Sequence, residues 1–252
     1  MEIIGYQLMH KTSLTKNDFK EYFITWGGFA LIEFLVTERN NIGTKFKTCL
    51  DIGSGEGVHT SIFRHAGLEV FQVDKYSNTA EYKVDFIEHE FDRKFDVIFC
   101  SHVIEHQRNV GDFLDRIYDV LSDDGVLIIS APKEDRNLIE GHLNSFIFPL
   151  FLQQMIHAGF DCKNGKFLST IENSFIVSKA DNFDTTERLE NGYQWTEKHQ
   201  NRSPIELKTS SVDMKFHNCQ HIQPNLTLKL PKNYWSYGMI INMERQGLKF
   251  HT

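Results

Sequence analysis

Short, almost continuously apolar runs alternate with amphipathic helical patterns along the middle of the chain. The clearest run is Phe95–Cys100, and a second run, Val126–Ser130, precedes Pro132. Continuous apolar runs of this length are typical of central parallel strands that are buried on both faces. Between the two runs, apolar residues recur at helical spacing until a polar break; they are Val110, Phe113, Leu114, Ile117 and Leu121, and the break is Ser122-Asp123-Asp124-Gly125.

The same alternation predicts further elements on either side. We expect strands over residues 49–52, 68–73 and 82–84, a helix from Val58 that Gly67 closes, and a helix over 148–158 that Gly159 ends. Asn164-Gly165 is a turn signal, and with the run ending in Ser174-Phe175-Ile176-Val177 it predicts a terminal antiparallel hairpin. The expected fold class is α/β, with a doubly wound, seven-stranded and mostly parallel sheet.

The chain divides into three expected parts. Residues 1–46 are predicted to form a helical cap, with Asn17-Asp18 capping a first helix and 29–38 forming a second. Residues 47–180 carry the catalytic sheet. Residues 181–252 form an extension that is loop-like as far as residue 211 and then alternates apolar and polar positions as half-buried strands do. We expect this β-rich extension to shape an acceptor site or a homodimer contact.

A glycine-rich loop follows the first expected strand. Residues 51–57 read Asp-Ile-Gly-Ser-Gly-Glu-Gly, and a helical pattern begins at Val58. Glycines without a Cβ let the backbone approach a ligand closely. The dinucleotide pattern requires a small residue where Val58 stands, and the Gly-Lys-Ser/Thr triplet of a phosphate-binding P-loop does not occur in the chain.

This loop resembles that of class I, Rossmann-like methyltransferases that use S-adenosylmethionine (SAM). The run from Phe95 to Pro132 resembles the ubiquinone- and menaquinone-biosynthesis type of small-molecule methyltransferase, although Asp124-Gly125 stands where that family often has Pro-Gly-Gly. The resemblance covers roughly residues 45–180. It implies SAM as cofactor and S-adenosylhomocysteine as product, with Asp51 near the cofactor's amino acid end and the glycines under its ribose and sulfonium. It also implies that Tyr22 and Trp26 form a lid or, alternatively, part of the core.

An acidic residue stands where a ribose would be bound. Asp74 ends the second expected strand, 23 residues after Asp51, and an acid at this position of nucleotide-binding α/β folds accepts hydrogen bonds from ribose hydroxyls. The resemblance further implies that Asp85 and Phe86 contact the adenine, unless they form a solvated turn. The full set of expected cofactor-binding residues is Asp51, Gly53, Ser54, Gly55, Gly57, Asp74, Lys75, Asp85, Phe86 and Ser101.

Three histidines are candidate catalytic residues, because a hydroxyl acceptor must lose its proton during methyl transfer and histidine is suited to that task. His102 follows the strand 95–100 directly and is the expected general base. His106 lies four residues later, and His142 lies in the loop after the next strand. Glu105 and His106 have an alternative role, which is to brace the loop by hydrogen bonds.

Residues 102–106 also match the inverted zinc-peptidase pattern His-x-x-Glu-His, but that pattern belongs inside a longer helix. The segment resembles small-RNA 3′-end methyltransferases as well, in which such residues hold a divalent ion against ribose hydroxyls. Glu105, His106 and His142 match that family in type, whereas His102 stands where it has a glutamate, a departure that favours a softer ion than Mg²⁺. We expect a reaction without a metal and keep the metal-assisted reaction as the alternative.

Composition limits which partners and which cellular compartment we expect for this chain. A net charge of −7 argues against a nucleic-acid partner, and no apolar run reaches the length of a membrane span. The N-terminus lacks the pattern of a secretory signal, and the four widely separated cysteines are expected to be buried free thiols in a cytoplasmic protein. We therefore expect a SAM-dependent methyltransferase that acts on a hydroxyl of a small polar metabolite, with a sugar or sugar-linked compound first. A phosphorylated or amine acceptor and a non-catalytic SAM-binding protein remain as alternatives.

Overall fold

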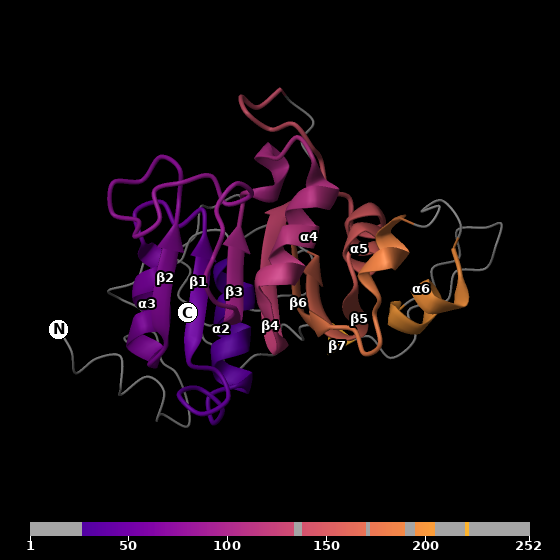
Figure 1. The fold of residues 1–252 in the computed structure, drawn as a ribbon, viewed down its shortest axis with the longest axis horizontal. Helices are drawn as coiled ribbons and strands as arrows, with labels where there is room; N and C mark the ends of the chain where they lie inside the picture. The colour runs from indigo at the N-terminus through magenta and orange to yellow at the C-terminus, as the bar shows by residue number, and fades with distance from the viewer. Residues whose placement is uncertain (1–26, 134–137, 170–171, 190–194, 205–219, 222–252) are drawn as a thin grey trace, which may run out of the picture.

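A mixed β-sheet forms the centre of the chain (Figure 1). The computed structural model describes residues 27–133, 138–169, 172–189, 195–204 and 220–221. The strands are β1 (Thr48–Ile52), β2 (Glu69–Val73), β3 (Phe95–Ser101), β4 (Leu121–Pro132), β5 (Phe160–Ser169), β6 (Glu172–Lys179) and β7 (Gln220–His221), in the order β2-β1-β3-β4-β6-β5-β7. Strands β2, β1, β3 and β4 are mutually parallel, whereas β6 is antiparallel to both β4 and β5. The predicted α/β class and the terminal antiparallel hairpin are confirmed.

Helices cover both faces of this sheet. They are α2 (Gly28–Thr37), α3 (Val58–Ala66), α4 (Val110–Val120), α5 (Phe148–His157) and α6 (Glu197–Arg202), with short 3-10 helices η2 (Ile104–His106) and η3 (Thr185–Leu189). In β3, Ile98 and Cys100 belong to the core cluster that contains α4 and α5, while Val97 and Phe99 belong to the cluster that contains α2 and α3. The continuous apolar run of β3 is explained by this two-sided burial.

The seven full strands that we expected are not confirmed. The predicted strand 82–84 is reduced to a single bridge between Tyr82 and Val73. Tyr82 and Val84 pack against the core, but Lys83 is exposed, and within the described residues the pairing of this edge segment does not extend beyond Tyr82. Six strands therefore have five or more residues, and β7, which pairs in parallel with β5, has two.

One predicted turn and one predicted polar break lie inside strands. Asn164-Gly165 belongs to β5, where the pairing with β6 shifts register between Asp161 and Lys166. The carboxylate of Asp161 accepts the N–H groups of residues 163 and 164 at 3.0 and 3.1 Å, so the turn chemistry produces a bulge and the strand continues. Likewise, residues 122–125 belong to β4, whose pairing with β3 shifts register between Phe95 and Val97.

The polar segment after residue 180 is more ordered than the sequence predicts. It contains η3 and α6, and Arg202 of α6 donates to the buried Glu187 of η3 at 3.0 Å. Thr196 and His199 form a capping box at the start of α6. Several expectations lie outside the described residues: the first N-terminal helix, the lid residues Tyr22 and Trp26, and the alternating strands after residue 211.

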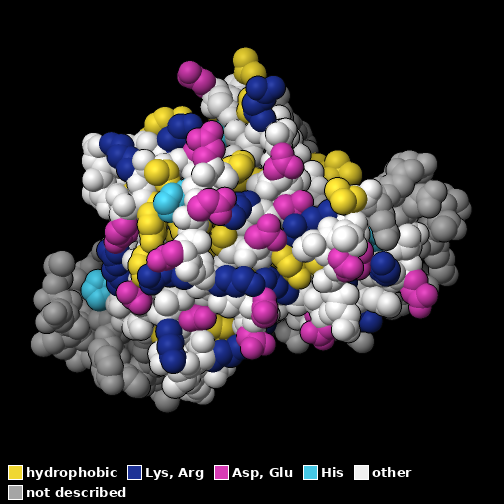
Figure 2. Space-filling view, in the orientation of Figure 1, with side chains coloured by type: hydrophobic (Ala, Val, Ile, Leu, Met, Phe, Trp, Pro, Cys, Tyr) yellow, Lys and Arg dark blue, Asp and Glu magenta, His cyan; other side chains and the backbone are white. Residues whose placement is uncertain are grey.

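The described cysteines are buried, and the surface carries mixed charges with a few exposed apolar side chains. Cys49, Cys100 and Cys162 are buried and free, while Cys219 lies outside the described residues. Figure 2 shows Lys and Arg side chains interspersed with Asp and Glu over the visible face. Exposed apolar side chains occur on the segment between β4 and α5, at Leu138, Ile139 and Leu143. None of the helices in the described part of the chain has the length and apolar character needed to cross a membrane.

Candidate active site

The glycine-rich loop connects β1 to α3 through three left-handed residues. Gly53, Gly55 and Gly57 have φ values of 69°, 52° and 76°. A Cβ at Gly53 would collide with Val103 Cγ2, and one at Gly57 would lie 2.9 Å from Gln72 Nε2, so both glycines are required for packing. A Cβ at Gly55 would meet nothing within 4 Å. Gly55 is therefore the position where the loop presents bare backbone to open space.

Two side chains of this region are buried beneath the loop. Asp51 Oδ2 accepts a hydrogen bond from Thr60 Oγ1 at 2.5 Å, which ties the end of β1 to α3. Burial raises the pKa of the Asp51 carboxyl to about 7. The hydroxyl of Ser54 is buried without a hydrogen-bond partner among the described residues. The structure thus places Asp51 as a brace within the fold and leaves Ser54 with an unsatisfied polar atom at the loop.

Asp74 anchors the glycine loop from the end of β2. Its Oδ2 accepts the N–H of Gly55 at 2.9 Å, and its Oδ1 accepts the N–H groups of Tyr76 and Ser77, both at 2.8 Å. The hydroxyl of Ser77 donates to the Gly55 carbonyl at 2.7 Å. The expected ribose acid therefore lies against the one glycine of this loop at which a Cβ would face open space.

The expected adenine contacts lie farther along the same edge. Lys75 and Asp85 pair with each other, with Nζ and Oδ2 3.1 Å apart. Phe86, the other expected adenine contact, is buried, and its ring packs against those of Phe91 and Phe113. Lys75 and Asp85 are therefore the more accessible residues of this set.

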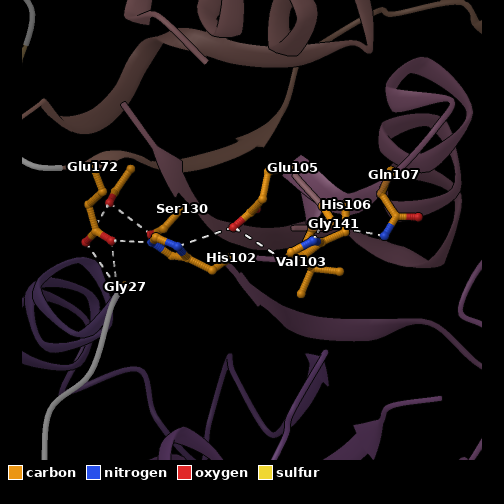
Figure 3. Close-up of polar contacts among 10 residues, drawn as sticks. Gly27, His102, Val103, Glu105, His106, Gln107, Ser130, Gly141 and Glu172 are labelled. Atoms are coloured by element: carbon orange, nitrogen blue, oxygen red, sulfur yellow. Dashed lines mark hydrogen bonds and ion pairs between the residues drawn. The ribbon is translucent and has the colours of Figure 1, made fainter. Parts of the chain in front are cut away.

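His102 is clamped between two buried carboxylates (Figure 3). Its Nε2 lies 2.9 Å from Glu172 Oε2, and its Nδ1 lies 3.3 Å from Glu105 Oε1. Its backbone has φ 55°, and its N–H donates to the Ser130 carbonyl at 3.0 Å. A left-handed conformation is uncommon outside glycine, so the surrounding contacts fix this residue in place.

This clamp does not suit the general-base role that we expected for His102. Burial alone would lower the pKa of the imidazole, but Glu105 and Glu172 together raise it to about 9. The ring is therefore an imidazolium near neutral pH, with its two nitrogens facing carboxylates. A general base needs an unprotonated nitrogen that faces the substrate.

Two residues near His102 escaped the sequence analysis. Glu172, at the start of β6, also accepts the N–H of Gly27 at 3.0 Å on each oxygen and so connects the start of α2 to the strand ends. A Cβ at Gly27 would collide with Ser101, the expected cofactor contact at the end of β3. His59 lies in the first turn of α3, where burial and the charge of His102 lower its pKa to about 4. No local pattern marks Glu172, whereas a histidine just after the glycine loop could have been noticed.

The remaining candidates gather beside this clamp. Glu105 and His106 belong to η2, and His142 comes from the segment after β4. One potential ligand atom from each of the three side chains lies within 4.8 Å of the others. The ring centroids of His106 and His142 are 4.9 Å apart. The structure thus brings together His102, His106 and His142 at the carboxyl ends of β3 and β4, as their positions in the sequence predicted.

The comparisons with known proteins agree with this architecture. A family model described as a methyltransferase domain matches residues 28–158. The 1,6-didemethyltoxoflavin-N1-methyltransferase of Burkholderia thailandensis, solved with S-adenosylhomocysteine, is 19% identical with a TM-score of 0.51 over 60% of this chain and 79% of that chain. A sugar N-methyltransferase from Streptoalloteichus sp. ATCC 53650 is 13% identical with a TM-score of 0.49 over 68% of this chain and 95% of that chain. A comparison with curated proteins gives no match.

Proposed function

The chain belongs to the methyltransferase-domain family, in the class I group that uses SAM, and on this premise we propose that it methylates a hydroxyl group of a small polar metabolite. SAM is the cofactor, and S-adenosylhomocysteine is the product that remains after transfer. A sugar or a sugar-linked compound is the first acceptor class that we propose. The fold and the family identify the cofactor but not the acceptor. The side chains at the proposed site support the choice of acceptor class.

One observation supports the proposal most strongly: the glycine loop and the polar strand end are in direct contact. Ile52 of β1 pairs with Cys100 of β3, so the residues that follow these strands emerge side by side. Gly53 packs so closely against Val103 that a Cβ would not fit. In open α/β sheets, ligands bind in the crevice beyond the carboxyl ends of such strands. Donor and acceptor can therefore meet between the glycine loop and η2.

The residues of the loop fit SAM. Gly55 leaves backbone open to the cofactor, and the Asp74 carboxylate behind it can accept hydrogen bonds from ribose hydroxyls. The buried Ser54 hydroxyl offers a polar atom that no described residue satisfies. When bound, SAM supplies an electrophilic methyl group on a sulfonium. The protein's contribution is mainly to hold the two reactants in line, because orientation alone can account for a large part of the rate.

A hydroxyl acceptor suits the polar groups beyond the loop. His106 and His142 offer two imidazoles to an incoming O–H group, beside the buried carboxylate of Glu105. The imidazolium of His102 lies between Glu105 and Glu172 and so holds the Glu105 side chain in position. An amine acceptor is already a good nucleophile and would have less need of these polar side chains.

A panel assay tests this proposal. The purified protein is incubated with methyl-labelled SAM and matched acceptors, namely free sugars, nucleotide-linked sugars, amino sugars and simple amines, and S-adenosylhomocysteine is measured by mass spectrometry. We expect product with at least one polyhydroxylated acceptor, with the label on oxygen. Label found on nitrogen only would contradict hydroxyl methylation. SAM binding with no product across the whole panel would favour a non-catalytic SAM-binding protein.

A further inference from the structure

The backbone of Gly55 is held on both sides by the segment that follows β2. Its N–H donates to Asp74 Oδ2 at 2.9 Å, and its carbonyl accepts the Ser77 hydroxyl at 2.7 Å. Thr79 Oγ1 lies 3.4 Å from the same carbonyl. These contacts are not local, because Gly55 precedes Asp74 by 19 positions and Thr79 by 24. Both polar backbone groups of this glycine are thus engaged by residues 74–79.

Gly55 is the glycine of the loop that most needs such hydrogen bonds. Glycine loses more conformational freedom on folding than any other residue, so its conformation is costly to fix. The flanking residues Gly53 and Gly57 are held by close packing, but a Cβ at Gly55 would meet nothing within 4 Å. The conformation in which Gly55 meets a cofactor therefore depends on its hydrogen bonds to Asp74 and Ser77.

The Ser77 hydroxyl has no hydrogen-bonding capacity left for a ligand. A hydroxyl donates one hydrogen bond and accepts two. Ser77 Oγ donates to the Gly55 carbonyl and accepts the N–H of Thr79 at 3.1 Å. It also lies 2.9 Å from Thr79 Oγ1, which is then the donor. Ser77 therefore holds the loop without contacting the cofactor through its hydroxyl.

The Asp74 carboxylate keeps only part of its capacity for the ribose. A carboxylate offers about four acceptor positions, and this one already accepts the N–H groups of Gly55, Tyr76 and Ser77. Oδ1 accepts two of these groups and Oδ2 accepts the other, so the position that remains is on Oδ2, beside Gly55. Its direction depends on how Gly55 and Asp74 lie relative to each other, and Ser77 is bonded to both residues.

We propose that Ser77 is a positioning residue for SAM, because its hydroxyl fixes Gly55 in the conformation that meets the cofactor. This inference rests on the SAM site of the proposed function. A loop that is already ordered in its bound conformation binds more tightly, because less entropy is lost on association. Without the hydroxyl, Gly55 retains only its bond to Asp74, and SAM has to order the loop as it binds. The effect falls on cofactor affinity, since Ser77 touches no reacting group.

Calorimetric titration with SAM tests this role in Ser77→Ala and Ser77→Thr. We expect Ser77→Ala to bind SAM about 3- to 10-fold more weakly, which is the range for one neutral hydrogen bond. Ser77→Thr keeps the hydroxyl and should bind within about twofold of the wild type.

Ser61→Ala is the matched control. The Ser61 hydroxyl also donates to the carbonyl of a loop glycine, Gly57, at 2.9 Å, but there the backbone N–H of Ser61 donates to the same carbonyl. The helical bond therefore holds Gly57 after the hydroxyl is removed, and Ser61→Ala should bind SAM as the wild type does.

Hydrogen exchange in the SAM-free protein measures the loop directly. Loss of the Ser77 hydroxyl should speed exchange of the Gly55 amide by about 3- to 10-fold, because the loop then opens more often. Ser77→Thr and Ser61→Ala should exchange this amide at the wild-type rate. An unchanged rate in Ser77→Ala would show that its hydroxyl does not fix Gly55, and it would overturn the inference.

The outcomes separate this inference from the proposed function. A wild type that binds SAM, together with a Ser77→Ala variant that binds as tightly as Ser61→Ala, overturns the role of Ser77 and leaves the SAM site standing. Weak binding by Ser77→Ala that Ser77→Thr does not restore also overturns it, because the hydroxyl is then not the cause. A wild type that does not bind SAM refutes the cofactor site itself, and the inference with it.

The affinity measurements need no acceptor. Weakened SAM binding by Ser77→Ala alone, in a protein that methylates nothing in the acceptor panel, supports the inference and counts against the proposed methyl transfer.

Discussion

Replacing Glu172 by glutamine should destabilise the fold far more than the same replacement of a carboxylate on the surface would. Glu172 is 2% exposed and accepts from His102 Nε2 at 2.9 Å and from the Gly27 N–H at 3.0 Å. Glu172→Gln keeps the volume and one acceptor oxygen for Gly27, but it removes the carboxylate from the imidazolium. A hydrogen bond to a charged group contributes about 1.5–3 kcal/mol, and breaking a buried pair costs about 3–5 kcal/mol. Because part of the network survives, we expect a loss of about 2–3 kcal/mol in the free energy of unfolding.

Chemical denaturation of chelator-treated protein measures this loss, and Asp123→Asn is the matched control. Asp123 also contacts two cationic groups, Lys94 at 3.2 Å and Lys179 at 3.1 Å, but it is 85% exposed, and exposed pairs contribute about 0–1 kcal/mol. A double-mutant cycle with His102→Asn, which tolerates the left-handed backbone, should give a coupling energy of about 1.5–3 kcal/mol. Equal losses for Glu172→Gln and Asp123→Asn, or a coupling energy near zero, would refute the stabilising clamp.

Two further substitutions probe the cofactor loop. Asp74→Asn should weaken SAM binding in calorimetry by about 1.5–3 kcal/mol, because a carboxylate that accepts ribose hydroxyls is lost. The control is Glu81→Gln, which alters another carboxylate that accepts a backbone N–H (2.7 Å) and should leave SAM affinity unchanged. Equal loss of SAM affinity in the two variants would show that Asp74 does not bind the ribose. The folded pKa of Asp51, about 7, lies above its unfolded value, so the folded state binds the extra proton and stability falls as pH rises from about 4 to 7. Asp51→Asn should therefore stabilise the SAM-free protein more at pH 8 than at pH 4, as measured by denaturation; a difference that does not change with pH would show that Asp51 is not buried as an acid.

The sequence predicted those features that depend on local pattern. The continuous apolar run of β3 and the helical spacing of α4 identify their elements because each is buried in the way the pattern implies. The glycine loop is recognisable because its backbone requires residues without a Cβ at fixed spacing, and the φ values of Gly53, Gly55 and Gly57 meet that requirement.

The errors arose where tertiary contacts override local preference. Asn164-Gly165 has the chemistry of a hairpin turn, but pairing with β6 on both sides of it maintains the strand and turns the signal into a bulge. The environment of His102 escaped the sequence for a related reason: besides Glu105, its pKa is raised by Glu172, 70 residues away, which no local pattern connects to it. The burial of Phe86 against two other phenylalanines could likewise not be predicted from local pattern.

The central claim, that the glycine loop binds SAM, is tested most directly by calorimetric titration of two matched glycine variants. Gly55 and Gly43 both have positive φ, 52° and 78°, and a Cβ at either would meet nothing within 4 Å. Gly55→Val and Gly43→Val should therefore cost similar backbone strain, about 1–2 kcal/mol. We expect wild type and Gly43→Val to bind SAM equally and Gly55→Val to show no binding, because its side chain would occupy the cofactor's path. Equal SAM affinity in the two variants would contradict the claim.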